Sequence, residues 1–301
     1  MRTGVLIDVR GSVDEIVAQV RRRHEQGFVS AWASQIFGYD AITLLAVVGR
    51  EVAGIDLGTA VVPVYSRLPQ VMAQQALTAQ AAAGGRFVLG VGLSHRVVVE
   101  GAWGIGFDRP ARYMREYLSA LVPMLAGDAV TFEGEVLTAR TSRPLEIPAP
   151  ARPPVLVAAL GPTMLRLAGR MADGTATWMT GTKTVAAHIV PSIVQAAAAA
   201  GRPAPRVAVS LPVVVTSDVD TAKRRIDEAL AIYPTLPSYR AMLDREGADA
   251  PSDVALVGDE EAVATGLARL ADAGATDFVA SIAGTGEERE RTAAVLVSLS
   301  G

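Results

Sequence analysis

The sequence predicts an α/β protein folded as a closed (β/α)8 barrel, the TIM-barrel architecture. Short apolar runs alternate along the chain with longer helical patterns, which is typical of βαβ units and a parallel sheet. Eight such runs occur in 301 residues, and a barrel of this kind typically needs about 250. An open, doubly wound sheet has the same local signature, so the count favours closure without proving it.

The expected strands are continuous apolar runs, because parallel strands in a barrel are buried on both faces. The third expected strand, 55–62, ends at Pro63, since proline cannot continue the hydrogen-bonded ladder. In chain order the strands are 5–9, 28–32, 55–62, 87–91, 155–159, 174–178, 207–216 and 276–283.

The helices between the strands are marked by their ends. Ser12 and Glu15 have the spacing of a capping box, and Gly27 is the expected stop of that helix. Later signals are a helix marked by Leu68, Val71, Met72 and Leu77 and stopped at Gly84, an amphipathic helix over 260–273 stopped at Gly274, and a second capping box at 285–288.

Two stretches are longer than a barrel connection needs. Residues 121–154 contain the strand-like segment 130–136 and several prolines, which predicts a hairpin excursion. Residues 231–254 also contain several prolines and have the length of a lid-type insertion. With no linker and no repeat of fixed period, we expect one domain over 1–301 with these two insertions.

Composition narrows the class of protein. The net charge is −3 and the only positive run, 21–23, lies on a predicted helix, so no nucleic-acid partner is expected. The lack of cysteine excludes disulfides and thiolate chemistry, and His24 and His188 lack acidic neighbours at ligand spacing, so no metal is expected. Neither a signal peptide nor an apolar run of about 18 residues is present. We expect a cytoplasmic protein with a small-molecule partner.

The segment from Val155 to Thr163 has the most specific local pattern. A strand runs into Gly161, and Pro162 stands at the first helical position, which accepts proline best. Exposed amides and the helix dipole at such a start favour an anion. An ordinary strand-to-helix turn gives the same spacing, but the position at a strand's carboxyl end favours phosphate binding.

A second pattern surrounds the fourth strand, where Gly90 and Gly92 allow close backbone approach and His95 follows directly. It matches neither a dinucleotide fingerprint, since His95 replaces the third glycine, nor a nucleophile elbow, which needs a second glycine after Ser94. His95 can serve as a proton donor or be structural. Trp178, at the end of another strand, can form the wall of a flat ring site or pack beneath a loop.

These residues resemble the bacterial luciferase-like superfamily of flavin and deazaflavin oxidoreductases, nearly end to end. The short motifs Trp178–Gly181 and Leu93–His95 resemble its deazaflavin branch. The likeness is carried by the order and spacing of 25–28, 57–61, 85–92, 113–118, 158–162 and 172–174.

The resemblance implies a luciferase-like barrel that binds its cofactor across the strand ends, and relatives are commonly homodimers. It also implies a non-prolyl cis peptide at Ala60–Val61, behind the cofactor ring. The cofactor's phosphate is expected at 160–163, and the ring or substrate pocket beside 92–95. The predicted cofactor-binding residues are Ala60, Val61, Gly92, Leu93, Ser94, His95, Ala159, Leu160, Gly161, Pro162, Thr163 and Trp178.

The sequence also departs from better-known deazaflavin dehydrogenases. Gln35-Ile36 stand where those enzymes have an Asp-His pair, and His95 replaces an acidic residue after strand four. Their acid–base mechanism therefore does not transfer, and His95 is the predicted catalytic residue. Glu100 and Asp40 are weaker candidates, as solvated or helix-capping carboxylates.

We therefore expect an enzyme of the luciferase-like class, a coenzyme F420-dependent oxidoreductase that moves hydride between the deazaflavin and a small organic substrate. One alternative is an FMN-dependent monooxygenase of the same superfamily. Another is a cofactor-binding homologue without turnover, which the missing Asp-His pair makes credible. The sequence names neither the substrate nor the direction of hydride transfer.

Overall fold

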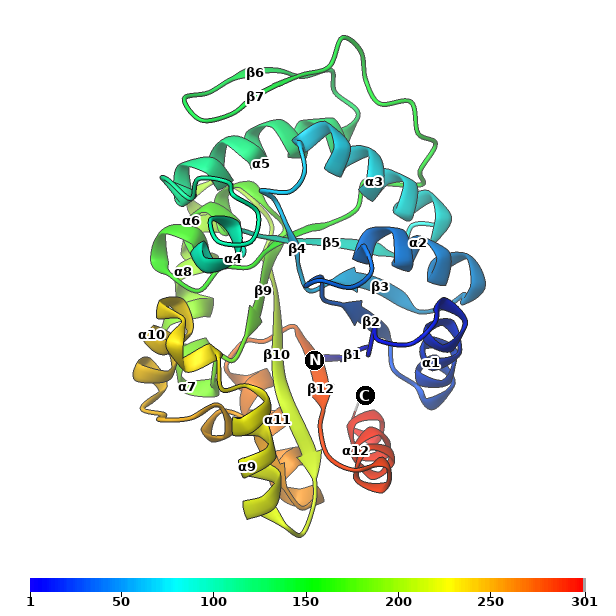
Figure 1. Cartoon of the computed structure of the whole chain (residues 1–301), viewed down its shortest axis with the longest axis vertical. Coiled ribbons are helices and arrows are strands. Elements are labelled where there is room, and N and C mark those ends of the chain that lie inside the picture. Colours follow the sequence, from blue (N-terminus) through cyan, green and yellow to red (C-terminus); the bar gives the residue numbers. More distant parts are fainter. Residues whose placement is uncertain (300–301) are drawn as a thin grey trace.

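A computed structural model describes residues 1–299 and shows a closed parallel barrel surrounded by helices (Figure 1). Each barrel strand pairs in parallel with the next, β9 pairs with β10, and β12 returns to β1. The open-sheet alternative is therefore wrong. The barrel strands are β1 (Arg2–Leu6), β2 (Ser30–Ala33), β3 (Asp56–Thr59), β5 (Phe87–Gly92), β8 (Val155–Val157), β9 (Gly174–Trp178), β10 (Arg206–Val215) and β12 (Asp277–Ile282).

All eight predicted strands are present, with two differences of physical interest. The first strand lies three residues earlier than predicted and includes Gly4, where an added Cβ would lie 2.2 Å from Ser30 Oγ. The predicted strand 55–62 is divided by a cis peptide at Ala60–Val61, as the resemblance implied. After it, the short strand β4 (Val62–Pro63) pairs with β5, and β11 (Leu256–Gly258) extends the sheet beside β10.

The helices cover the outside of the barrel, and their capping signals are confirmed. Ser12 and Glu15 form the expected capping box, as do Thr285 and Glu288, and Gly27 ends its helix in the left-handed conformation. The helices are α1 (Val13–Gln26), α2 (Ala41–Glu51), α3 (Pro69–Ala82), α4 (Arg96–Val99), α5 (Pro110–Ala126), α6 (Pro162–Met171), α7 (Thr182–Thr184), α8 (Val190–Ala199), α9 (Val219–Ala229), α10 (Pro237–Glu246), α11 (Glu260–Asp272) and α12 (Gly286–Ser298), with a π-helical turn at Val185–Ile189.

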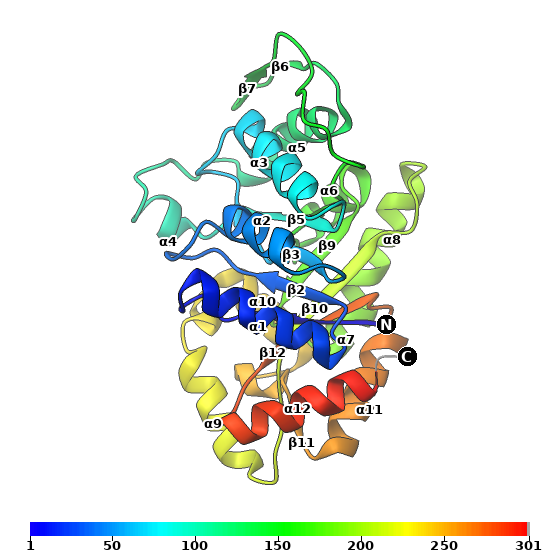
Figure 2. The ribbon, with the colours of Figure 1, turned by 90° about the vertical axis from the view of Figure 1, so that its right-hand side faces the viewer.

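The two long connections take different forms. In the first, α5 continues to Ala126, and the antiparallel strands β6 (Thr131–Glu133) and β7 (Thr138–Arg140) follow. This hairpin projects beyond α5 at one end of the molecule (Figures 1 and 2). The predicted strand over 130–136 was too long, because its last residues form the turn. In the second connection, α10 lies between 3-10 turns at Tyr233–Thr235 and Pro251–Asp253.

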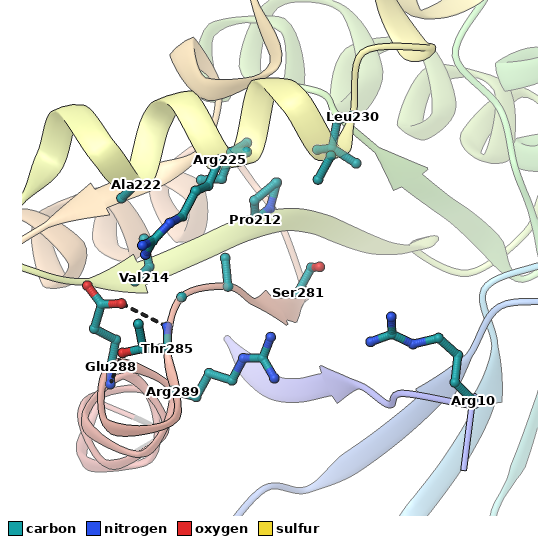
Figure 3. A pocket seen from close by; sticks show the side chains of 14 residues that line it. Arg10, Pro212, Val214, Ala222, Arg225, Leu230, Ser281, Thr285, Glu288 and Arg289 are labelled. Carbon is teal, nitrogen blue, oxygen red and sulfur yellow. Dashed lines mark hydrogen bonds between the residues drawn. The ribbon is translucent and has the colours of Figure 1, made fainter.

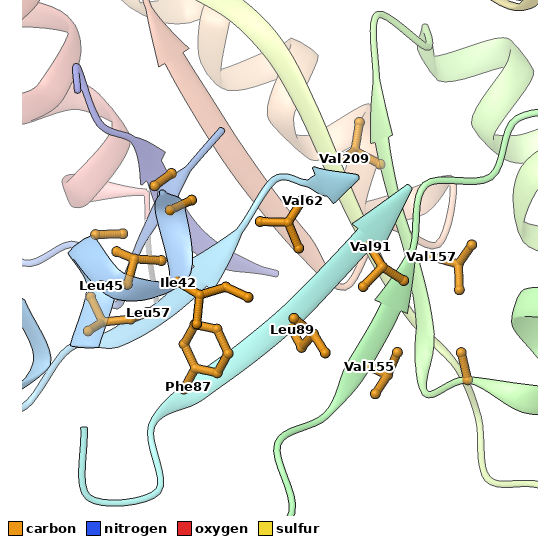
Figure 4. Close-up of a cluster of buried hydrophobic side chains, with 14 of the residues drawn as sticks. Ile42, Leu45, Leu57, Val62, Phe87, Leu89, Val91, Val155, Val157 and Val209 are labelled. Atoms are coloured by element: carbon orange, nitrogen blue, oxygen red, sulfur yellow. The ribbon is translucent and has the colours of Figure 1, made fainter. Parts of the chain in front are cut away.

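The main hydrophobic core lies between the strands and their helices. Leu57, Phe87 and Leu89 are fully buried on the outer strand faces, against Ile42 and Leu45 of α2 (Figure 4). A smaller cluster fills the barrel itself, with Trp32 as its largest member. None of the helices within residues 1–299 has the length and hydropathy needed to cross a membrane.

Candidate cofactor site at the carboxyl ends of the strands

The predicted cofactor-binding residues meet on one part of the barrel rim. They follow β3, β5, β8 and β9, which are consecutive neighbours in the sheet. Their segments are 60–61, 92–95, 159–163 and Trp178. Parallel strands place all these carboxyl ends on the same face of the barrel, which is where TIM-barrel active sites lie.

Two glycines of β5 make room for the segment after β3. An added Cβ on Gly90 would lie 2.0 Å from the carbonyl oxygen of Thr59, and one on Gly92 would lie 2.7 Å from Val61 Cγ2. The Thr59 hydroxyl donates to the carbonyl of Gly90 and accepts from its amide, each at 2.8 Å. Gly90 and Gly92 therefore let the Ala60–Val61 segment pack closely against β5.

The mouth of the barrel is apolar and open to solvent. Leu6, Ala60 and Ala176 pack on the cluster inside the barrel, yet each remains partly exposed. Solvent therefore reaches the top of the interior cluster, and two of these three side chains, those of Ala60 and Ala176, are small. A planar ring that settled here would bury apolar surface, which is the main favourable term in ligand binding.

The start of α6 is open in the way that an anion site requires. Gly161 caps the helix with no side-chain hydrogen bond, and an added Cβ would have no atom within 4 Å. The first amides of a helix have no partner inside the helix, so those of Thr163 and Met164 are free to donate. The guanidinium of Arg166 donates to the Thr163 hydroxyl at 3.1 Å and adds positive charge.

His95 lies between β5 and α4 and is half-buried. Burial lowers the pKa of its imidazole below the usual 6.5, because a charged ring loses solvation. The imidazole makes no hydrogen bond to residues 1–299, and its ring centre lies 5.7 Å from that of Tyr239. The preceding residue, Ser94, has a left-handed backbone conformation (φ 60°).

Three aromatic contacts connect His95 to Trp178 across the rim. Tyr239 of α10 meets Tyr233 edge-on at 4.9 Å, and Tyr233 meets Trp178 edge-on at 6.0 Å. Burial raises the pKa of the Tyr233 hydroxyl, and the nearby indole N–H opposes that rise without reaching regular hydrogen-bond geometry. Both tyrosines come from the 231–254 insertion, where the sequence analysis found no chemistry. The only sequence feature that could have indicated their role is the presence of two tyrosines six positions apart.

The weaker candidates have structural roles. Asp40 caps α2 by accepting from the Thr43 amide at 2.8 Å, and it pairs with Arg67. Gln35 accepts from the Ala41 amide and from Arg67, each at 3.1 Å. Glu100 pairs with Arg96 at 2.5 Å on the surface. None of the three contacts His95, so His95 remains the predicted catalytic residue.

The structure has two cavities of about 540 Å³ each, and none of the predicted cofactor-binding residues lines either one. One is bounded by β10, β12, α9 and α12 (Figure 3). The other lies at the loop after β2, beside Ile36 and Tyr39. Arg10 lines both, so they adjoin. The sequence analysis missed the first, because its arginines are far apart in the chain.

Comparison with known proteins finds relatives of similar sequence and fold. A putative coenzyme F420-dependent oxidoreductase of Mycobacterium tuberculosis is 31% identical over 167 residues, covering 52% of this chain and 48% of that protein. The F420-dependent tetrahydromethanopterin reductase of Methanopyrus kandleri superposes with a TM-score of 0.83 at 21% identity, over 98% of this chain and 97% of that one.

An FMN enzyme has nearly the same fold. The oxygenating constituent of 3,6-diketocamphane monooxygenase of Pseudomonas putida, in complex with FMN, superposes with a TM-score of 0.79 at 17% identity, over 100% of this chain and 97% of that one. The family model for luciferase-like monooxygenases matches residues 1–297. This chain belongs to the luciferase-like monooxygenase family.

Proposed function

We propose that the protein is a coenzyme F420-dependent oxidoreductase acting on a small organic substrate. One observation carries the proposal: an uncapped, solvent-open helix start at Gly161 lies on the same rim as the apolar mouth formed by Leu6, Ala60 and Ala176. A cofactor with an anionic tail and a flat ring matches this pair of features. The names of the Mycobacterium and Methanopyrus proteins support F420 over FMN.

The residues present fit such a cofactor. The amides of Thr163 and Met164 would hold its phosphate, with the Thr163 hydroxyl and Arg166 beside them. Ala60, Val61, Gly92, Leu93, Ser94, Ala159 and Leu160 would line the ring and its connecting chain, and Trp178 would form a wall. When bound, the deazaflavin supplies hydride exchange at its carbon-5.

The chain's own contribution would be orientation and exclusion of water. The rim would fix where a ring can lie, and the aromatic residues from His95 through Tyr239 and Tyr233 to Trp178 would shield part of the mouth. Holding two reacting atoms in close contact removes much of the entropic barrier to their reaction. His95, neutral at pH 7, would donate an N–H hydrogen bond to a substrate oxygen.

Titration with the two cofactors tests the assignment. We expect F420 to bind and FMN to bind at least about tenfold more weakly. Tighter binding of FMN, together with oxygen consumption by the reduced FMN complex, would indicate a monooxygenase instead. The similar fold of the Pseudomonas FMN enzyme is the reason to test this alternative. F420 that binds without bleaching across a broad substrate panel would indicate a homologue without turnover. Gln35 stands where better-known deazaflavin dehydrogenases have an acidic residue, and it makes structural hydrogen bonds instead, so a homologue without turnover is a specific alternative.

A pair of variants at Gly161 locates the anionic group. The position has an ordinary φ of −81° and open space, so Gly161→Asp and Gly161→Asn should both fold, and both side chains can cap α6. Only Asp adds a negative charge. We expect Gly161→Asp to bind F420 about tenfold more weakly than Gly161→Asn. Equal affinities of the two variants would place the cofactor's phosphate elsewhere.

A further inference from the structure

The cavity between α9 and α12 has a charged side and an apolar side. Arg10, Arg225 and Arg289 line it, against a single acidic residue, Glu288. Val214, Ala222, Ile226, Leu230 and Ala283 form apolar wall and floor, and Val214, Ala222 and Ile226 belong to one buried cluster. In Figure 3, Arg10 and Arg289 extend toward each other from opposite sides, while Arg225 descends from α9.

The three arginines of the cavity outnumber the two carboxylates beside them, Asp8 and Glu288. Arg225 and Arg289 make no ion pair or side-chain hydrogen bond with any residue from 1 to 299. Arg10 pairs with Asp8 at 2.6 Å. The Glu288 carboxylate is held in the α12 capping box, where it accepts from the Thr285 amide at 2.8 Å. The charge of Arg225 acts on Glu288 and that of Arg289 acts on Asp8, so two carboxylates face three guanidinium groups. The excess positive charge attracts an anion, and the planar donors of arginine suit a carboxylate or a phosphate.

The position of the cavity separates it from the predicted phosphate corner. It lies at the ends of β10 and β12, the seventh and eighth barrel strands, whereas α6 follows β8 on another part of the rim. Loops after these two strands frequently bind phosphate groups in TIM barrels. The volume of about 540 Å³ is in the range of small-ligand pockets.

We propose that this cavity binds an amphipathic organic anion, with its carboxylate or phosphate between Arg225 and Arg289 and its hydrocarbon part against the apolar wall. Arg10 contributes from the β1 side. The identification of that anion as the substrate of the oxidoreductase rests on the proposed function. The binding site itself does not.

The test uses three probes with the same chain length and the full protein without cofactor. Hexanoate and hexyl phosphate carry the anionic groups, and hexanamide is the uncharged match. Isothermal titration should show both anions binding at least about tenfold more tightly than hexanamide. The ratio between the two anions distinguishes a carboxylate site from a phosphate site.

Matched variants assign the binding to the cavity. Arg225→Gln and Arg289→Gln should each weaken anion binding at least about tenfold and leave hexanamide unchanged. Arg289→Lys keeps the charge but loses the planar donors, so it should retain only part of the affinity. Arg224→Gln is the control, because Arg224 lies next along α9, donates to Thr221 and does not line the cavity. Thermal melting confirms that each variant is folded.

Two results would overturn the inference: anions that bind the wild type no better than hexanamide, or anion binding that survives the Arg225→Gln/Arg289→Gln double variant. Loss in Arg166→Gln instead would assign the anion to α6. An F420 titration keeps the two proposals apart. If F420 binds and the anions do not discriminate, the cavity proposal alone fails. If the arginines bind anions but F420 does not bind, the proposed function alone fails.

Discussion

His95 combines three properties in one side chain. It follows β5 on the catalytic face, it is half-buried beside Tyr239, and its imidazole has no hydrogen-bond partner among residues 1–299. Burial favours the neutral ring, so its pKa is lower than 6.5 and the imidazole is uncharged at pH 7. A neutral imidazole has one N–H to donate and one nitrogen to accept. A substrate oxygen would satisfy the free donor.

The pH dependence of turnover follows from the lowered pKa of His95. If neutral His95 is the active form, as we propose, kcat/KM should stay level above about pH 6.5 and fall at lower pH as the ring gains a proton. His95→Gln should lower kcat about a hundredfold and remove that acidic fall. Activity that rises in acid would instead make imidazolium the proton donor. An unchanged rate in the variant would exclude His95 from the mechanism.

Gly90 tests whether close packing at the rim depends on a missing side chain. In Gly90→Ala the new methyl group would lie 2.0 Å from the Thr59 carbonyl oxygen, so β5 or the Ala60–Val61 segment has to move. We expect the free energy of unfolding to fall by about 2 kcal/mol in urea denaturation. Gly161→Ala, with open space around it, is the control and should change stability much less. Equal effects would refute the packing argument.

Among the elements, the β6–β7 hairpin depends on one carboxylate of α5. Glu116 is 2% exposed and accepts from the amides of Glu135, Val136 and Leu137, at 3.2, 2.9 and 3.1 Å. Burial works to raise its pKa, but these three donors and Arg112 outweigh burial and leave the pKa below 4.5. The motif that carried the family resemblance thus includes the residue that anchors this excursion.

Glu116→Gln should lower the free energy of unfolding by about 2 kcal/mol at pH 7, because the new amide turns a donor toward backbone donors. A carboxyl with a lowered pKa stabilises the fold above its unfolded pKa and loses that effect as pH falls through the folded pKa. The difference between wild type and variant should therefore shrink below pH 4.5. The exposed Glu135→Gln is the control, with an expected loss below about 1 kcal/mol. A difference that persists to pH 3 would contradict this role.

Local sequence signals predicted most elements because their causes are local. Capping at Ser12 and Thr285 and the left-handed Gly27 depend on residues a few positions apart. The split of the third strand was predictable only through the family resemblance. Helix α2 was not predicted, although Asp40 was considered as a possible capping carboxylate and does cap it.

The site was predicted less completely than the fold, because it depends on contacts between distant segments. The ring contact between His95 and Tyr239 joins β5 to the 231–254 insertion, and no pattern in either segment points to the other. The arginine cavity is similar, since Arg10, Arg225 and Arg289 meet only after the barrel closes. Closure itself depends on the pairing of β12 with β1, which strand counting could not establish.

For the whole molecule, a buried ion pair joins the last two barrel strands at the amino-terminal end of the barrel. Asp277 of β12 is 1% exposed and accepts from Arg206 of β10 at 2.6 and 2.8 Å, and that guanidinium lies over the Trp32 ring. Asp277→Asn should lower the free energy of unfolding by about 3 kcal/mol, since Arg206 keeps its charge without a counter-ion. Asp244→Asn removes an exposed pair with Arg240 and should cost below about 1 kcal/mol. Similar losses in both variants would contradict a special role for the buried pair.

The most direct test of the assignment is a crystal structure of the protein with F420. The phosphate should accept hydrogen bonds from the amides of Thr163 and Met164, and the ring should lie over Leu6 and Ala176, beside Ala60, Val61 and His95. A ring located away from this mouth, or a phosphate held by Arg225 and Arg289 while the start of α6 stays free, would contradict the account.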